Sequence, residues 1–302
     1  MKKIVFFTLL LLVSGINSGK CYAASELQTQ IPFEFIDGSI ILNIRINDNA
    51  RPLKMLFDTG ANGIAVDRHL ADSLNLKSDF DKTTDVVGGS RRISISGNNT
   101  IHLADNFSLK NQNIAIFDNG SSRTGYDGII GLNLAYYYII NVDFNKQIIS
   151  FYNFGDYAFE SEGELLDITA PDGIIIVPAV LDLIGKKSIA GEFVFDTGAN
   201  YHLIAFEQFV RKNRLLLSGF KPERESQTVS MGVSTPTYDG KAHSFSIGES
   251  ITLEQMPVCL QASSGRNTGE SKISDGSIGI DLIKNFNFTI DLIREKIHLK
   301  PN

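Results

Sequence analysis

The sequence contains no tryptophan and only two cysteines among its 302 residues, Cys21 and Cys259. Two cysteines form at most one disulfide, which excludes a small fold held together by several bridges. A basic excess is also absent, because 34 acidic residues outnumber 28 Lys and Arg and the formal net charge is −6. Proteins that bind nucleic acid normally present a basic face. We therefore expect no nucleic-acid partner.

Long hydrophobic runs are absent except at the N-terminus. Lys2 and Lys3 precede the apolar residues 4–13, and small residues then surround Ala23. A positive start, a short apolar run and small residues at a cleavage site are typical of a secretory signal peptide. The run is shorter than the ~20 residues that a membrane-spanning helix needs. We predict that residues 1–23 are a signal peptide and that the protein is secreted or periplasmic.

Cys21 allows an alternative, in which the protein is a lipoprotein anchored through this cysteine. Lys20 precedes it where lipoprotein signals carry a small residue, so membrane anchoring is not favoured. Removal of the signal peptide would leave Cys259 as the only cysteine of the mature chain, without a disulfide partner. Cys259 lies in the apolar stretch MPVCLQ, and we expect a buried, unreactive thiol there.

Metal-binding and phosphate-binding motifs are also missing. The five histidines, at positions 69, 102, 202, 243 and 298, show no ligand spacing such as His-x-x-x-His. The chain lacks a Gly-Lys-Ser/Thr loop of the kind that cradles phosphate. We predict no metal and no cofactor.

What the chain does contain is an internal repeat. The pentapeptide Asp-Thr-Gly-Ala-Asn occurs at residues 58–62 and again at residues 196–200, each time after a short apolar run. An Asp-Gly pair follows each copy, at Asp127 and at Asp275. The matching order indicates a duplication with two similar lobes rather than a solenoid. We place the N-terminal lobe at residues 24–160 and the C-terminal lobe at residues 161–302.

The local pattern is mostly that of β-strands. Residues 39–46 alternate, and residues 53–58 and 192–196 form apolar strands that end at the two motifs. Two hairpins are expected to close the halves, with turns at 145–146 and 294–295. Amphipathic patterns predict one helix after each motif, within residues 66–76 and 206–216, and possible short helices at 131–138 and 279–286.

The motif has a definite chemistry. Each Asp stands at the tip of a loop where a strand ends, and the glycine after it permits a tight turn. Two such loops facing each other would bring Asp58 and Asp196 close together. Two carboxylates at that distance cannot both ionise, so the pair holds one proton. One can then act as general base on a water molecule while the other donates a proton to a substrate carbonyl.

With these repeated motifs, the chain resembles the retropepsin-like aspartic peptidases and their two-lobed pepsin-type relatives. Further shared features are the elements around Gly131 and Gly279 and the closing hairpins. The resemblance implies an all-β fold of two β-barrel lobes with a few short helices and the active site at the lobe interface. It implies a peptide or protein substrate and a monomer. It makes Asp58 and Asp196 catalytic, and it assigns the support of the catalytic loops to Thr59, Gly60, Thr197 and Gly198.

Family members cover the substrate with a flap hairpin. The candidate flaps here are residues 86–92, with Gly88 and Gly89, and residues 229–235, with Gly232. The first candidate lacks the tyrosine that grips substrate in many relatives. Arg91 and Arg92 are compatible with a preference for acidic peptides or with a simple exposed pair.

Another departure lies directly beside the dyad. Ala61 and Ala199 stand where many pepsin-type members carry Ser or Thr. A hydroxyl at this position would hydrogen-bond the carboxylate and favour its charged form. We therefore expect a pH optimum less acidic than that of a digestive enzyme.

Two other functions are compatible with parts of the pattern. The fold could serve as a non-catalytic periplasmic peptide-binding or sensor protein, although such a protein would not need both carboxylates. A sugar-kinase-like or actin-like ATPase also carries Asp-x-Gly-x-Asn after a strand, but the signal peptide argues against it because ATP is scarce outside the cytoplasm. Structural roles are expected for Asp127, Asp143, Asp275 and Asp291.

Overall fold

The computed structural model describes residues 23–302 apart from 87–88, 118–124, 231–232 and 263–273. Residues 1–22 of the predicted signal peptide, including Cys21, therefore lie outside the described residues, as do Gly88 and Gly232. No helix in the described part of the chain is long and apolar enough to cross a membrane.

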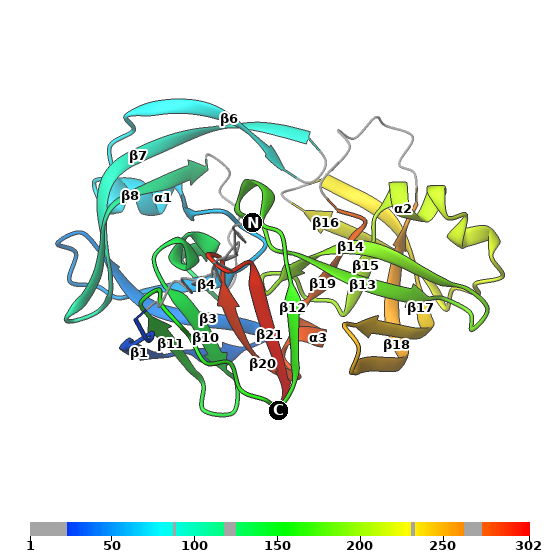
Figure 1. Ribbon diagram of the computed structural model, residues 1–302. Helices are drawn as coiled ribbons and strands as arrows, with labels where there is room; N and C mark the ends of the chain where they lie inside the picture. The colour runs from blue at the N-terminus through cyan, green and yellow to red at the C-terminus, as the bar shows by residue number, and fades with distance from the viewer. Residues whose placement is uncertain (1–22, 87–88, 118–124, 231–232, 263–273) are drawn as a thin grey trace, which may run out of the picture.

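The molecule contains two six-stranded β-barrels built in the same way, one from each half of the chain (Figure 1). The first has the order β3-β4-β9-β5-β8-β7 and is closed by pairing of β7 with β3. The second has the order β13-β14-β19-β15-β18-β17 and is closed by pairing of β13 with β17. The predicted all-β, two-barrel fold is therefore confirmed.

The bounds of these strands follow the duplication. The first sheet comprises β2 (Glu34–Ile36), β3 (Ser39–Ile46), β4 (Leu53–Asp58), β5 (Ile64–Asp67), β6 (Phe80–Val86), β7 (Gly89–Ala104), β8 (Phe107–Phe117) and β9 (Gly128–Gly131). The second comprises β13 (Ile176–Asp182), β14 (Ser188–Asp196), β15 (Leu203–Ala205), β16 (Arg224–Ser230), β17 (Val233–Ile247), β18 (Ile251–Gln261) and β19 (Gly276–Gly279). Each barrel thus has the same succession of strands around its Asp-Thr-Gly motif.

A third sheet joins the two halves. Its order is β1-β11-β10-β20-β21-β12, so the first three strands come from one half and the last three from the other. The strands are β1 (Leu27–Pro32), β10 (Ile139–Asp143), β11 (Ile148–Tyr152), β12 (Glu164–Asp167), β20 (Phe286–Asp291) and β21 (Lys296–Pro301). The two predicted closing hairpins are β10–β11 and β20–β21, and they pair with each other through β10 and β20.

One strand of this sheet was not expected from the sequence. β12 lies in the polar connector between the halves, where Leu165 is 45% exposed. It pairs with β21 only and forms the edge of the sheet, and only one of its four residues is buried. An edge strand therefore lacks the continuous apolar pattern that marks a buried strand.

Two long hairpins extend from the barrels, β6–β7 in the first and β16–β17 in the second. The hairpin β6–β7 arches over the top of the molecule towards the other half (Figure 1). The two segments predicted as flaps, residues 86–92 and 229–235, lie at the tips of these hairpins, although 87–88 and 231–232 are outside the described residues. Gly89 begins β7 and pairs with Val86.

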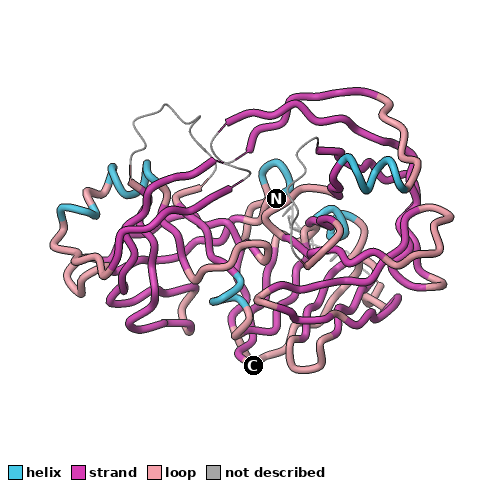
Figure 2. The backbone as a smooth tube through the Cα atoms, turned by 180° about the vertical axis from the view of Figure 1, so that it is seen from behind, coloured by secondary structure: helices cyan, strands magenta, loops and turns pink. Residues whose placement is uncertain are grey.

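The helices are short and lie beside and between the sheets (Figure 2). A helix follows each motif as predicted, but each is shorter than expected because a residue with positive φ, Asn75 or Arg214, lies shortly after it. The helical segments are α1 (Arg68–Ser73), η1 (Leu132–Tyr136), η2 (Pro171–Gly173), α2 (Glu207–Lys212), η3 (Leu215–Leu217) and α3 (Ile280–Ile283). The short helices expected at 131–138 and 279–286 are thus η1 and α3.

The hydrophobic core runs without a break through both barrels and the central sheet. Phe195 of β14 packs edge-on against Phe288 of β20, with 5.1 Å between the ring centroids. Both rings are almost completely buried. Because the strand that ends at the second motif packs on the sheet shared by both halves, the position of the motif is fixed relative to both barrels.

Candidate active site

Asp58 is the last residue of β4. The strand before it is apolar, and Met55 and Phe57 are completely buried in the barrel. β4 pairs in parallel with β9, so that Asp58 lies opposite Gly131. The chain then turns, and the backbone N–H of Gly131 donates to the carbonyl of Gly63 at 2.8 Å. β9 therefore lies behind the loop that carries Asp58 and supports it.

The second half repeats this arrangement. Asp196 ends β14 and lies opposite Gly279 of the parallel strand β19. A Cβ atom placed on Gly279 would lie 2.2 Å from the carbonyl oxygen of Tyr201. Because the obstacle is backbone, only glycine allows β19 to approach the second loop this closely.

The two loops face each other directly. A Cβ atom on Gly60 would lie 2.5 Å from Cγ of Asp196, and one on Gly198 would lie 2.3 Å from Cγ of Asp58. Each carboxyl group is therefore packed against the glycine of the opposite loop. Each is also oriented by its own loop, because the N–H groups of Gly60 and Gly198 donate to the Oδ1 atoms of Asp58 and Asp196 at 2.9 Å.

The two threonines lock the loops together. The Thr59 hydroxyl donates to the carbonyl of Phe195 at 2.5 Å and accepts from the N–H of Thr197 at 3.0 Å. The Thr197 hydroxyl donates to the carbonyl of Phe57 at 2.8 Å and accepts from the N–H of Thr59 at 3.0 Å. Both threonines are completely buried. All four hydrogen bonds cross from one half to the other.

The electrostatics favour a shared proton. Burial raises the pKa of Asp196 well above its usual range, and the negative charge of Asp58 and a hydrogen bond with its carboxyl group raise it further. The N–H of Gly198 lowers this pKa, but less than burial and the neighbouring charge raise it. The pair can therefore hold one carboxylate and one protonated carboxyl group side by side.

The residue that directly follows each Asp-Thr-Gly-Ala-Asn motif differs between the two halves. Gly63 has a φ of 126°, and a Cβ atom placed on it would meet nothing within 4 Å. Its counterpart in the second half is Tyr201, whose pKa is raised by burial first and by the charge of Asp196 second. A bulky side chain therefore lies beside Asp196, and open space lies at the matching position near Asp58. Sequence analysis did not single out this difference, although aligning the two motifs reveals it.

The other acidic residues near the motifs form structural contacts. Asp127 accepts from the N–H of Lys54 and from Arg51, both at 2.8 Å, and Asp275 accepts from the N–H of Glu192 at 3.0 Å. Both carboxylates thus hold the strands that lead to the dyad. Asp143 and Asp291 cap the turns of the two closing hairpins.

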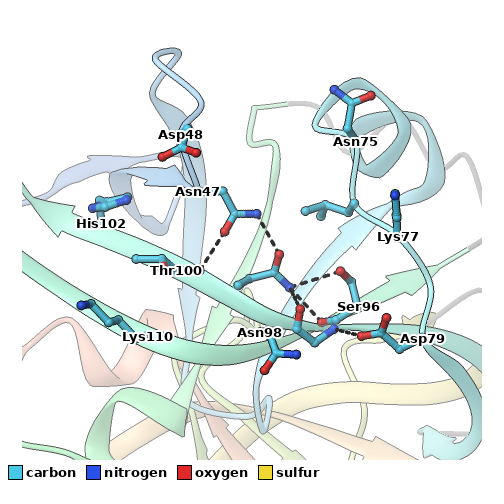
Figure 3. Close-up of a pocket in the computed structure, with 13 residues that line it drawn as sticks. Asn47, Asp48, Asn75, Lys77, Asp79, Ser96, Asn98, Thr100, His102 and Lys110 are labelled. Carbon is cyan, nitrogen blue, oxygen red and sulfur yellow. Dashed lines mark hydrogen bonds between the residues drawn. The ribbon is translucent and has the colours of Figure 1, made fainter.

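A separate hollow of about 580 Å³ lies on the outer side of the first barrel (Figure 3). Its main polar group is the buried amide of Asn99, which donates to the Ser96 carbonyl at 2.9 Å and accepts from Asn47 at 2.9 Å. These bonds secure the irregular register between β7 and β8. The lining contains none of the predicted site residues, and its central amide is engaged in this structural network.

Cys259 does not add a reactive thiol to the site. Cys259 is a half-buried free thiol, and burial, followed by the neighbouring Asp239, raises its pKa to about 12. A thiol with such a pKa is a poor nucleophile. Among the described residues, no group of three or more His, Cys, Asp or Glu side chains is arranged to hold a metal ion.

Comparison with known proteins finds a sequence family and a fold that are similar to this chain. Residues 42–134, which include the first motif, match a family described as aspartyl protease. The whole fold is similar to the crystal structure of the aspartic proteinase from Irpex lacteus, with a TM-score of 0.54 and 15% sequence identity over 91% of this chain and 97% of that chain. No curated protein sequence matches the chain. At this level of identity the structural similarity establishes the fold.

Proposed function

We propose that this chain, whose resemblance to the aspartyl proteases is confirmed by its fold and by the family match in its first half, is an active aspartic endopeptidase. The observation that carries the proposal is the packing of two carboxyl groups against each other across the lobe interface, with the pKa of one raised by burial and by the charge of the other. A binding protein has no chemical need for such a pair.

The chemistry follows from the two protonation states. Asp196 retains the shared proton because it is desolvated beside Asp58. Asp58, as carboxylate, removes a proton from a water molecule that attacks the scissile carbonyl, while Asp196 donates its proton to the carbonyl oxygen. When the tetrahedral intermediate collapses, Asp58 passes the proton that it took from water to the leaving nitrogen, and Asp196 takes a proton back from a hydroxyl group of the intermediate, which regenerates the pair. The four interlobe bonds of Thr59 and Thr197 keep the carboxyl groups at a fixed separation during this exchange.

The substrate in this proposal is a peptide or protein segment in an extended conformation, bound as an added strand. In this proposal the hairpins β6–β7 and β16–β17 are the flaps that cover the bound peptide. Because both carboxyl groups belong to one chain, a monomer is sufficient for activity.

The test is digestion of a diverse peptide library by the mature protein, read by mass spectrometry from pH 3 to pH 8. Asp58→Asn and Asp196→Asn should each abolish cleavage while circular dichroism shows unchanged folding. Asp48→Asn, an exposed carboxylate on the turn after β3, serves as the matched control and should cleave like the unaltered protein. A folded protein that binds peptides but produces no cleavage at any pH would support the alternative, a peptide-binding or sensor protein.

The cellular location is part of the proposal. Export through the N-terminal segment predicts a mature chain that begins at Ala24. N-terminal sequencing of the protein from expressing cells tests this, and a Cys21→Ser variant separates the two routes. Membrane association that is lost in this variant would indicate a lipid anchor, whereas an unchanged soluble product would support cleavage after Ala23.

A further inference from the structure

Two tight turns, one from each half, lie against the catalytic loop of the other half. Asp37 and Gly38 join β2 to β3, and Asp172 and Gly173 precede β13. All four residues have positive φ, with values of 49°, 73°, 52° and 73°. β3 and β13 occupy the same place in the two barrels, so the turns are related by the duplication.

The contacts of these turns reach the last residue of each motif. The side-chain amide of Asn62 donates to the backbone carbonyl of Asp172 at 2.6 Å. On the opposite side, a Cβ atom on Gly38 would lie 3.4 Å from Oδ1 of Asn200. Asn62 and Asn200 are each four positions after the catalytic Asp of their loop. The turns therefore flank the dyad symmetrically.

Each turn carries an exposed carboxylate. Among the described residues, neither Asp37 nor Asp172 forms an ion pair or a side-chain hydrogen bond. Some other acidic side chains on the surface are paired, for example Asp81 with Arg92 at 2.7 Å and Asp239 with Arg224 at 2.8 Å. Within the described part of the chain, Asp37 and Asp172 therefore present unpaired carboxylates beside the two loops.

We propose that Asp37 and Asp172 are specificity-determining residues that bind basic side chains of the peptide, one on each side of the scissile bond. This inference rests on the proposed peptidase function. A peptide that crosses the dyad as an extended strand advances about 3.4 Å per residue and passes one turn on each side. Lys and Arg have long stems that carry their charge to such a carboxylate.

The two positions differ in one neighbour. The ring of Tyr136 is 47% exposed, and its hydroxyl lies close to Gly173 of the second turn. An exposed ring beside a carboxylate suits a guanidinium group, which stacks on the ring and bonds the carboxylate in a bidentate manner. In the second half the position of Tyr136 is taken by Lys284, which pairs with Asp281 at 2.8 Å. Arg should therefore be preferred over Lys on the Asp172 side only.

Arg92 of the hairpin β6–β7 does not oppose this preference. The sequence left open a selection of acidic peptides by Arg91 and Arg92. Arg92 is paired with Asp81 across β6 and β7. Its charge is therefore compensated within its own hairpin.

The experiment measures both binding and cleavage of matched peptides. Each carries Lys, Arg or Gln at one position near the scissile bond, and a second set has a hydroxyl-containing isostere in place of the scissile amide. Asp37→Asn and Asp172→Asn are compared with Asp48→Asn, which removes an equal charge far from the dyad. The unaltered protein should prefer Lys over Gln by about two- to fivefold on each side. Asp37→Asn should remove the preference on one side and Asp172→Asn on the other.

The salt dependence and a Tyr136 variant test the inference further. The preference should weaken as salt is raised, because exposed charges are screened. Tyr136→Leu should remove the advantage of Arg over Lys beside Asp172 and leave the other side unchanged. Equal treatment of Lys and Gln by the unaltered protein would overturn the inference. Selective binding of basic isostere peptides without any cleavage would uphold it and overturn the proposed catalytic activity.

Discussion

At the scale of single residues, the carboxyl group of Asp196 combines desolvation with a neighbouring negative charge. Folding therefore favours its protonated form, and its folded pKa lies above the value of about 3.9 that an unfolded Asp has. Below about pH 4 the folded and the unfolded protein both bind the proton, so Asp196 does not lower the free energy of unfolding. As the pH rises through the folded pKa, the unfolded state has already released its proton and the folded state is progressively penalised.

The raised pKa of Asp196 predicts that Asp196→Asn stabilises the folded protein, and that this stabilisation depends on pH. The variant should have a higher free energy of unfolding than the unaltered protein at pH 7, and the difference should disappear below about pH 4. Urea unfolding followed by circular dichroism between pH 3 and pH 8 measures it. Asp48→Asn should show no such pattern. If the variant is no more stable than the unaltered protein at pH 7, ionisation of Asp196 does not destabilise the folded state.

The alanines beside the dyad predict a shift in the pH profile. Ala61→Ser or Ala199→Ser places a hydroxyl where it can donate to the adjacent carboxylate and favour its charged form. The acidic limb of kcat/KM against pH should then move to lower pH. The profile is measured with one neutral peptide from pH 2 to pH 8. An unchanged limb in both variants would show that the hydroxyl does not reach the carboxylate.

At the scale of elements, the two catalytic loops are held by their hydroxyl and backbone groups, while β9 and β19 support them from behind. Removal of one threonine hydroxyl leaves a buried carbonyl and a buried N–H without a partner. For Thr59 these are the carbonyl of Phe195 and the N–H of Thr197. Each unsatisfied buried group costs about 1–3 kcal/mol.

Thr59→Val should therefore lower the free energy of unfolding by about 2–4 kcal/mol, because two buried groups lose their partner. Thr59→Ser keeps the hydroxyl and should lose much less. Cleavage should fall sharply in the Val variant even under conditions where it is folded, because the carboxyl groups lose their fixed separation. Denaturant unfolding and peptide cleavage are measured together. A larger loss in the Ser variant than in the Val variant would assign the effect to packing of the methyl group instead.

Much of the fold and of the candidate site could be predicted from the sequence, because the repeated pentapeptide and the apolar strands before it are local patterns. The strand that ends at Asp58, the helix after it and the hairpin turns are each encoded within a few residues. The contact of Asn62 with the turn at Asp172 could not be predicted in this way, because it joins segments 110 residues apart. The second turn still carries a signal, since an Asp-Gly pair precedes an Ile-rich strand in each half.

At the scale of the whole molecule, the central sheet makes the two halves depend on each other. β10 and β20 pair with Ile140 opposite Ile290 and Val142 opposite Phe288, and all four side chains are completely buried. The amide of Asn141 donates to the Thr289 hydroxyl at 2.9 Å across the same junction. Separation would expose this apolar surface and two unpaired strand edges.

We therefore expect a single cooperative unfolding transition. Calorimetry of residues 24–302 should give equal calorimetric and van't Hoff enthalpies. Residues 24–160 and 161–302 produced separately should self-associate or aggregate through the exposed edges. Mixed during refolding, the two fragments should recover cleavage. Two separate transitions, or a stable monomeric half, would contradict this dependence.

The difference between Gly63 and Tyr201 makes the two sides of the candidate site unequal. A peptide has a direction, and the residues on the two sides of its scissile bond are not equivalent. An enzyme assembled from two identical chains places the same residues on both sides of the scissile bond. With both halves on one chain, a bulky ring can stand beside one carboxyl group and empty space at the matching place near the other. In the proposed peptidase, the duplicated chain would therefore distinguish the two ends of a peptide, whereas a symmetric pair of subunits presents the same surroundings to both ends.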